Sequence, residues 1–345
     1  MSAPAHAVRV HGVDDLRLDT VRPREPALNE AMVDIHYGGI CGSDVHYWQN
    51  GAVGASALRH PMVLGHEVVG VVAREARDGS GPPAGTAVAV HPGQTCGHCR
   101  FCRSGRPHLC PECRYLGSAA QWPHTDGGFT TQLVVQAQRL IPLPAGLSLR
   151  QAVLAEPTSV AWHAVERAVA VGQPVRDASV LVVGAGPIGL LIAAVALHLG
   201  AALVTVADLL PRPLEIARQL GAHSAVDVAD LPGDTAADAV FESSGTPAGL
   251  ATALHGAARG GTIVAVGQLP QTDIGTPAWL VPSRELTVTG CLRVNSELPM
   301  ALRFLTEAAV DPITSHEFPL GRAEEAFGVA ARADISSKVV LRFAD

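Results

Sequence analysis

The sequence predicts an α/β protein of two domains, one rich in irregular β-strands and one built from alternating strands and helices. The chain has 345 residues, of which 48% are hydrophobic, enough to bury two cores. Its first third consists of short β-like runs separated by Gly and Pro clusters. From about Leu149 onward, strands alternate with helical patterns, which is typical of repeated strand–helix–strand units. These observations set the fold class.

Individual strands are predicted where apolar or β-branched runs are bounded by turn residues. In the first region the expected strands are 7–10, 32–35, 68–73, 87–90 and 130–135. In the second region they are 179–183, 203–207, 239–242 and 262–266. The tail from Cys291 does not continue the alternation; it holds two amphipathic helical stretches and a closing strand, 338–343. We therefore expect one domain of residues 1–153 completed by 291–345, and a second of residues 154–290.

Charge and hydropathy exclude several classes of partner. The formal net charge is -7 and no Lys/Arg-rich run occurs, which argues against nucleic acid and anionic membranes as partners. The stretch 1–10 lacks the features of a secretory signal, so a cytoplasmic protein is expected. Residues 187–207 are almost uniformly apolar, but His198 and Gly200 divide them into a helix and a strand. A buried parallel-sheet element explains this stretch better than a membrane span. Small molecules remain as partners.

A glycine-rich turn indicates a dinucleotide site. The run 179–183 leads into Gly184-Ala-Gly-Pro-Ile-Gly189 and then an apolar helix, the setting in which Gly-x-Gly-x-x-Gly cradles a pyrophosphate. Asp208 ends the next strand, where its carboxylate can bind ribose hydroxyls and repel a 2′-phosphate. NAD is thus favoured, although Arg212 leaves NADP open. Simple turns in a flavodoxin-like domain are the alternative. The predicted cofactor-binding residues are Gly184, Gly186, Pro187, Ile188, Gly189, Asp208 and Val266.

Four closely spaced cysteines predict a structural zinc site: Cys96, Cys99, Cys102 and Cys110. Four thiolates can surround one zinc ion and leave no position open for a substrate. Cys113 is a rival to Cys110, and an iron–sulfur cluster is the alternative occupant. A disulfide framework is disfavoured if the protein is cytosolic. Cys291 is expected to be a buried, inert thiol.

A second group of residues predicts a metal site that remains open. Cys41 lies in Gly-Gly-Ile-Cys-Gly-Ser-Asp-Val-His, and His66 and Glu67 lie in a Gly-His-Glu run after a β-like segment. A thiolate, an imidazole and a carboxylate can hold zinc and leave one position for water or substrate. Taken singly, each motif is more often a core cysteine or an ordinary turn. Their occurrence beside a four-cysteine segment and a dinucleotide motif favours the metal site.

The order of these parts along the whole chain resembles the zinc-containing medium-chain alcohol dehydrogenase family. The parts are the Cys41 segment, Gly-His-Glu, the four cysteines, Ala155-Glu-Pro157 and the glycine turn. The segment 41–47 is similar to the sorbitol dehydrogenase branch. Segments 38–54, 60–69 and 115–129 look like the L-idonate 5-dehydrogenases. The resemblance implies a GroES-like catalytic domain and a Rossmann domain, and oxidation of a secondary alcohol of a sugar acid or polyol with zinc and NAD.

The resemblance also implies roles for matching residues. Cys41 and His66 would ligate the catalytic zinc, with Glu67 and Glu156 completing the shell, one of them through a bound water. Glu156 stands where the alcohol dehydrogenases proper have a cysteine, which leaves the third ligand open. Asp44 would fix the tautomer of His66.

Further implied roles concern the proton and the substrate. Ser43 and His46 would relay the alcohol proton to solvent, and Arg293 would bind a sugar-acid carboxylate. Candidates to line the pocket are Tyr47, Tyr115 and Trp122, with core aromatics as the alternative. A solvated surface arginine is the alternative for Arg293. L-Idonate is the leading substrate, giving 5-ketogluconate; sorbitol, xylitol and, less closely, threonine are rivals. A non-catalytic NAD-binding sensor on the same fold is the alternative function. The resemblance further implies a homodimer or homotetramer formed through the sheet edge at 285–290.

Overall fold

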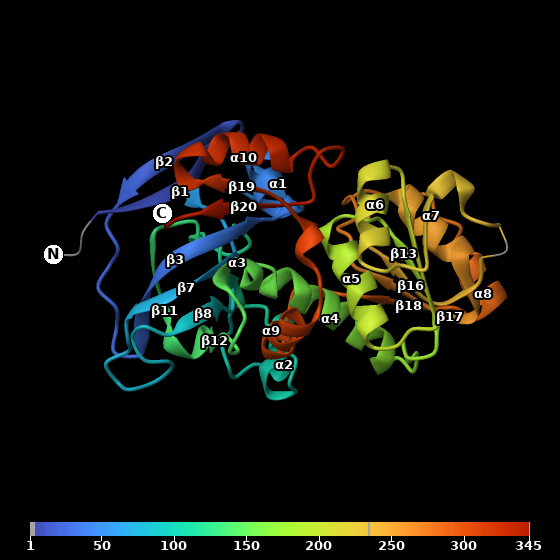
Figure 1. The fold of residues 1–345 in the computed structure, drawn as a ribbon, viewed down its shortest axis with the longest axis horizontal. Coiled ribbons are helices and arrows are strands. Elements are labelled where there is room, and N and C mark those ends of the chain that lie inside the picture. Colours follow the sequence, from blue (N-terminus) through green and yellow to red (C-terminus); the bar gives the residue numbers. More distant parts are fainter. Residues whose placement is uncertain (1–3, 234, 345) are drawn as a thin grey trace.

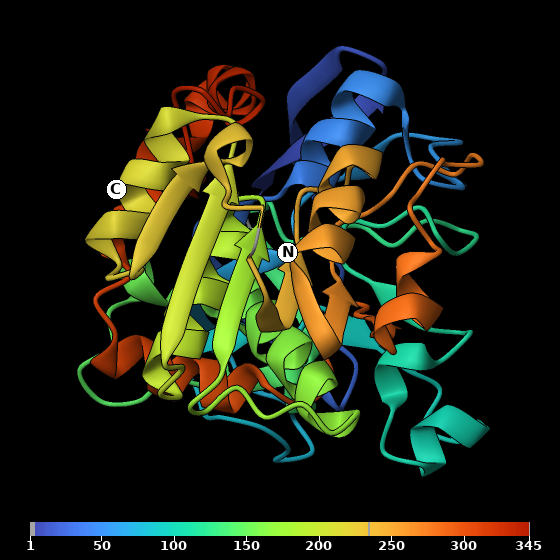
Figure 2. The same ribbon diagram turned by 90° about the vertical axis from the view of Figure 1, so that its right-hand side faces the viewer.

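The computed structural model describes residues 4–233 and 235–344, which form two lobes side by side (Figure 1). The structure does not describe residues 1–3, 234 and 345. These residues belong to the N-terminal stretch and to the domain ranges predicted above. The first lobe is β-rich and contains both described ends of the chain. The second lobe is a parallel sheet with helices on both faces (Figure 2).

The β-rich lobe is organised around a sheet of seven strands within the described residues. In spatial order these are β12 (Leu140–Pro142), β8 (Ala87–Val90), β7 (Glu67–Arg74), β3 (Glu30–Ile40), β20 (Lys338–Arg342) and β19 (Thr314–Pro319), with β11 (Gln132–Gln136) also paired to β3. A smaller sheet holds β2 (Asp15–Val21), β1 (Ala5–Gly12) and β6 (Met62–Val63). Short pairs are β4 (Ala52–Val53) with β5 (Ser56–Ala57), and β9 (Gly93–Gln94) with β10 (Arg114–Tyr115). The helices are α1 (Gly42–Asn50), α2 (Arg100–Arg103), α3 (Leu149–Ala152) and α10 (Ala323–Ala330).

The second lobe has its parallel strands in the order β15-β14-β13-β16-β17-β18. They are β13 (Ser179–Val183), β14 (Leu203–Asp208), β15 (Ser224–Asp227), β16 (Ala237–Glu242), β17 (Ala257–Ala265) and β18 (Thr287–Gly290). Their helices are α5 (Pro187–His198), α6 (Pro211–Gln219), α7 (Pro247–Gly256) and α8 (Leu280–Arg284). This order, with the first strand in the middle, is that of the Rossmann fold, which binds dinucleotides beyond the carboxyl ends of the central strands.

Two helices join the lobes. α4 (Ala155–Ala170) packs on α5 of the second lobe, on α9 (Leu298–Glu307) and on β7 of the first. One cluster of buried apolar residues accordingly runs from β7 and β8 through α4 into β13 and β14. The two lobes therefore share one continuous apolar core on the side of α4.

Each expected strand is found, most with end shifts of a few residues, but β3 runs five residues past its expected end and β17 begins five residues before its expected start. The tail does return to the first lobe, where β19 and β20 join the sheet of β3. The strands that were not expected are β2, β4, β5, β6, β9, β10, β12, β15, β18 and β19, most of them only two to four residues long. The apolar stretch 187–207 is the 12-residue α5 followed by a turn and most of β14. Among the described residues, no helix has the length and apolarity needed to cross a membrane.

Candidate metal and cofactor sites

The four predicted cysteines lie close together in the loop around α2 of the first lobe. The Sγ–Sγ distances are 3.5 Å for Cys96–Cys110, 3.6 Å for Cys99–Cys102 and 4.0 Å for Cys96–Cys102. Tetrahedral zinc with bonds of about 2.3 Å places its sulfurs about 3.8 Å apart, whereas a disulfide is about 2.05 Å long. The spacing therefore fits a zinc ion. Cys113 is buried but does not belong to the group, so Cys110 is the better fourth ligand.

Backbone groups prepare these thiols to bind a cation. Cys99 caps the N-terminus of α2, where its Sγ accepts the amide N–H of Cys102, and Cys96 Sγ accepts the N–H of Cys99 at 3.4 Å. The Cys102 amide is the main reason that the pKa of Cys99 is lowered to about 7. A thiolate at neutral pH is the form that binds metal.

Replacing Cys99 with serine is expected to release one zinc ion per chain and to lower the midpoint of thermal unfolding, because a structural zinc contributes directly to folding. Cys113→Ser is the matched control, and it should keep the full zinc content. Zinc per chain, measured by atomic emission on dialysed protein, checks both variants. Equal zinc content in Cys99→Ser and wild type would contradict the assignment.

The second metal group lies where β3 ends beside the start of β7. These strands are antiparallel, with Gly39 opposite Glu67, so Cys41 emerges next to His66. The Cys41, His66 and Glu67 ligand atoms lie within 4.8 Å of one another. A Cβ at Gly39 would collide with the Glu67 carboxylate, so glycine makes room for it. The half-buried thiol and the buried imidazole and carboxylate fit zinc by their donor chemistry.

Asp44 holds the two metal-binding segments together. It is fully buried in the first turn of α1; its Oδ2 accepts the N–H of Cys41 and its Oδ1 the N–H of Gly65, each at 3.0 Å. The distance from Oδ1 to Nδ1 of His66 is 3.9 Å, beyond hydrogen-bond range. At this distance the expected hydrogen bond that would fix the His66 tautomer is not made.

Glu67 has a partner that the sequence analysis missed. Lys338, the only lysine of the chain, donates to both Glu67 oxygens at 2.6 Å and to the carbonyl of Ile40 at 3.1 Å. Both side chains are buried, with 3% and 1% exposed. Burial raises the pKa of Glu67 to about 7, and the charge of Lys338 opposes the rise. The clue available beforehand was that a chain using arginine elsewhere keeps one lysine.

Glu156 lies on α4, close enough to the metal group for its charge to act on His66. It lies in the first turn of α4, is buried, and accepts the Tyr115 hydroxyl on Oε1 at 2.6 Å. It is not part of the 4.8 Å group. Burial lowers the pKa of His66, but the negative charges of Cys41, Asp44 and Glu156 outweigh it, so that the pKa is raised overall.

The predicted relay and pocket residues lie on α1. Ser43 is half-buried, and His46 is exposed with its Nδ1 3.2 Å from Nδ2 of Asn50. Among the described residues, no hydrogen bond joins Ser43 to His46. Tyr47 is buried, and its hydroxyl accepts the N–H of Ala119 at 2.9 Å, so it anchors the loop that contains Ala119.

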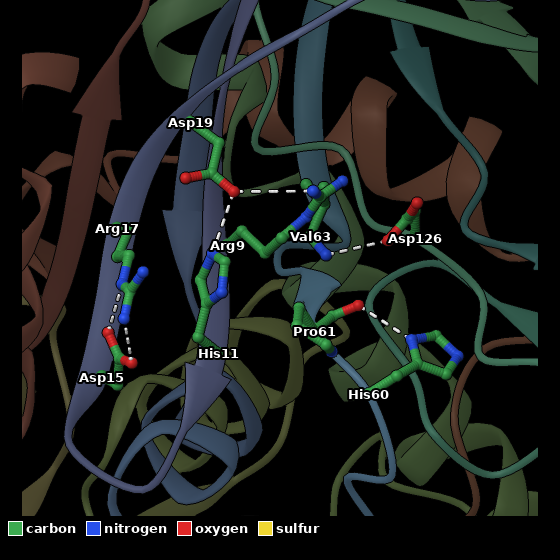
Figure 3. Close-up of polar contacts among 9 residues, drawn as sticks. All are labelled: Arg9, His11, Asp15, Arg17, Asp19, His60, Pro61, Val63 and Asp126. Atoms are coloured by element: carbon green, nitrogen blue, oxygen red, sulfur yellow. Dashed lines mark hydrogen bonds and ion pairs between the residues drawn. The ribbon is translucent and has the colours of Figure 1, made fainter.

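The segment 115–129 lies along the strand that leads to His66. The N–H of Val63 donates to Asp126 Oδ1 at 2.9 Å, a contact seen in Figure 3. The N–H of Gly127 donates back to the Val63 carbonyl at 2.7 Å, and Gly128 N–H to the Gly65 carbonyl at 2.8 Å. These bonds hold the segment against the chain that leads to His66.

The glycine turn has the geometry that a pyrophosphate requires. Gly184 has φ +95°, and a Cβ there would press on the backbone of Ser244. A Cβ on Gly189 would collide with the Gly184 carbonyl, which shows how closely α5 approaches the strand. Gly186 caps α5 and is exposed, with open space beside it. A phosphate group can reach the helix N-terminus there.

The remaining cofactor candidates surround this turn. Asp208 accepts the N–H of Ala185 on Oδ2 at 2.6 Å and that of Leu210 on Oδ1 at 2.9 Å. Val266 is half-buried just after β17, and its N–H donates to the Glu242 carbonyl at 2.8 Å. A cleft of about 200 Å³ is lined by candidates from both lobes and by Lys338: Cys41, Glu67, Gly186, Pro187, Ile188, Asp208 and Lys338.

Arg293 is half-buried in a pocket, not a solvated surface residue. Its φ is +58°, a conformation that non-glycine residues rarely adopt. Its guanidinium carbon lies 4.8 Å from the centre of the Tyr115 ring, a cation–π contact. His91 and Asn295 line the same pocket.

Comparison with known proteins identifies two matching domains. The alcohol dehydrogenase GroES-like domain matches residues 27–145, and the zinc-binding dehydrogenase domain matches residues 187–307. The L-idonate 5-dehydrogenase (NAD(P)(+)) of Escherichia coli strain K12 is 36% identical over 323 residues, which cover 91% of this chain and 92% of that protein. The sorbitol dehydrogenase of Gallus gallus is 33% identical, with 97% and 96% covered.

Solved structures agree with this placement. The crystal structure of Escherichia coli L-idonate 5-dehydrogenase matches with a TM-score of 0.93 and 33% identity over 99% of both chains. An alcohol dehydrogenase of Escherichia coli CFT073, solved with NADH, matches with a TM-score of 0.89 and 26% identity over 99% of this chain and 100% of that one. The chain therefore belongs to the zinc-containing medium-chain alcohol dehydrogenase family, in its sorbitol and polyol dehydrogenase branch, as an oxidoreductase that uses zinc and a nicotinamide dinucleotide.

Proposed function

We propose that the protein oxidises the C5 hydroxyl of L-idonate to give 5-ketogluconate, with NAD as the hydride acceptor. The observation that carries this substrate is the position of Arg293 over the ring of Tyr115, whose hydroxyl contacts Glu156. A guanidinium beside a metal site suits a substrate with a carboxylate at one end and a secondary alcohol further along. The likeness to the Escherichia coli L-idonate enzyme supports the same choice.

In the proposed site, Cys41 and His66 hold the catalytic zinc, with Glu67 or Glu156 as the carboxylate ligand. Zinc, when bound, acts as a Lewis acid on the substrate hydroxyl oxygen while NAD accepts the hydride. Ser43 accepts the substrate's hydroxyl proton as it gives up its own, which passes through a bridging water to His46, and the exposed His46 exchanges it with solvent. The buried Lys338 neutralises Glu67 and holds it beside the thiol and imidazole.

We propose NAD as the preferred cofactor because Asp208 lies at the end of β14 in the cleft, where a 2′-phosphate would meet its negative charge. We also take residues 1–153 with 291–345 as the catalytic domain and 154–290 as the dinucleotide domain; the pairing of β20 with β3 supports this division.

β18 is an edge strand with Val288 exposed, and we propose that it pairs with a second copy to form a homodimer.

Arg293→Ala is expected to raise KM for L-idonate and to lower kcat/KM by about 10- to 100-fold, because a charge-assisted hydrogen bond contributes about 1.5–3 kcal/mol. Oxidation of sorbitol, which has no carboxylate, should change little. Steady-state rates on L-idonate, sorbitol, xylitol and L-threonine with NAD and NADP check this. Arg303→Ala, an exposed arginine on α9, is the control.

A neutral polyol dehydrogenase is the second candidate, favoured by the likeness to sorbitol dehydrogenases. Wild-type protein that oxidises sorbitol faster than L-idonate, with Arg293→Ala unchanged on both, would replace the first proposal with this one. A non-catalytic sensor would show no turnover on the panel and less than two zinc ions per chain.

A further inference from the structure

Tyr115 lies between His66 of the metal group and the pocket that Arg293 lines. Its side chain is 8% exposed. Its hydroxyl donates to Glu156 Oε1 at 2.6 Å, and its ring centre is 5.7 Å from that of His66. The guanidinium carbon of Arg293 lies 4.8 Å from the same ring. One side chain therefore touches Glu156, a candidate metal ligand, and Arg293, the candidate carboxylate-binding arginine.

The backbone gives this side chain little freedom. Tyr115 ends β10 and pairs with Gly93 of β9, and the N–H of the next residue, Leu116, donates to the Pro92 carbonyl at 3.1 Å. The adjoining Arg114 is bonded to the carbonyl of Pro123 at 2.9 Å. The residues before and after Tyr115 are therefore both anchored by hydrogen bonds, which fixes the position from which its side chain reaches Glu156.

The hydrogen bond has a defined direction and leaves a defined oxygen free. A carboxylate only accepts, so the phenol is the donor. Tyr115 bonds Oε1, and no hydrogen bond to Oε2 is found among the described residues, so Oε2 is the less constrained oxygen and the one we take to face a metal. A buried hydrogen bond of this kind between a carboxylate and its outer partner orients the carboxylate and tunes the metal.

We infer that the Tyr115 hydroxyl is a positioning group for Glu156, while the Tyr115 ring positions Arg293 for the substrate carboxylate. This inference rests on the proposed function and deepens it. The hydroxyl acts on metal binding and on kcat, and the ring acts on KM for an acid. The two effects are separable because phenylalanine keeps the ring and removes only the hydroxyl.

Tyr115→Phe is expected to lower the affinity of the catalytic site for zinc by about 10- to 100-fold, the usual effect of removing a hydrogen-bond partner of a metal ligand. Zinc release under competition with a coloured chelator measures this without any turnover. In the cobalt-substituted protein, the visible absorption bands should shift. With zinc restored by excess, kcat should fall on L-idonate and sorbitol alike, while KM for L-idonate stays within about twofold of wild type.

Two further variants exclude a merely structural effect. Tyr37→Phe removes a hydroxyl from a half-buried tyrosine of β3 and should match wild type in every readout. In a double-mutant cycle, Tyr115→Phe made on top of Glu156→Gln should cause little further zinc loss, because the hydroxyl acts through Glu156. Zinc-release curves of Tyr115→Phe that overlay wild type, or equal and additive effects in the cycle, overturn the inference.

The readouts also separate this inference from the proposed function. Wild type that fails on L-idonate, with a Tyr115→Phe zinc site still weakened, would refute the substrate and keep the positioning role. Wild type active on L-idonate, with Tyr115→Phe unchanged in zinc affinity and kcat, would refute the positioning role alone.

Discussion

Replacing Cys41 with serine is expected to lower turnover by about 10³-fold or more while NAD binding stays close to wild type. Zinc supplies several kcal/mol of charge stabilisation to the reacting oxygen, and each 1.4 kcal/mol is a factor of ten in rate. A serine hydroxyl at neutral pH is a poor substitute for the thiolate ligand. The glycine turn that receives the dinucleotide lies in the other lobe, between β13 and α5, and does not depend on the thiol.

Steady-state rates with L-idonate and quenching of protein fluorescence by NADH measure the two effects on one preparation. Cys291→Ser is the control, because Cys291 is half-buried and belongs to no metal group among the described residues. Equal losses of activity and of NADH affinity in Cys41→Ser would count against a metal role for Cys41.

Replacing Lys338 with methionine is expected to lower the free energy of unfolding by about 3–5 kcal/mol, the range found when one partner of a buried ion pair is removed. The reason is local: the Glu67 carboxylate is 1% exposed and takes both its bonds from Lys338. Without the ammonium group, a carboxylate remains buried beside the thiol of Cys41. Urea unfolding followed by circular dichroism measures the change.

A second substitution shows whether the stranded charge is the cause. In the double variant Lys338→Met with Glu67→Gln, the charge is gone, so part of the lost stability should return. If the free energy of unfolding of the single Lys338→Met variant lies within about 1 kcal/mol of the wild-type value, the account is contradicted, because removing one partner of a buried ion pair should cost more.

Local motifs explain why much of the site could be predicted from the sequence. Cys96, Cys99 and Cys102 are neighbours on one short turn, so their spacing alone brings three sulfurs together. The glycine turn is likewise set by consecutive residues between a strand and a helix. For Cys41 and His66 the sequence offers only donor chemistry, the company of the other motifs and the resemblance to a family, since strand pairing, not spacing, places them side by side.

Contacts made across the fold could not be predicted in the same way. Lys338 lies 271 positions from Glu67, and its place depends on the pairing of β20 with β3. The bond of Tyr115 to Glu156 joins a loop strand to α4 over 41 positions. The unexpected strands β15 and β18 have four residues each, too short to show a period, and are defined by their neighbours in the sheet.

The central claim is that Cys41 and His66, with a carboxylate beside them, hold a zinc ion in the cleft that receives the dinucleotide. Anomalous X-ray scattering from a crystal, recorded on either side of the zinc absorption edge, locates such ions without assumptions about activity. We expect two peaks per chain, one within the four cysteines and one bonded to the Cys41 sulfur and the His66 imidazole. A single peak confined to the four cysteines, in protein that oxidises its substrate, would contradict the account.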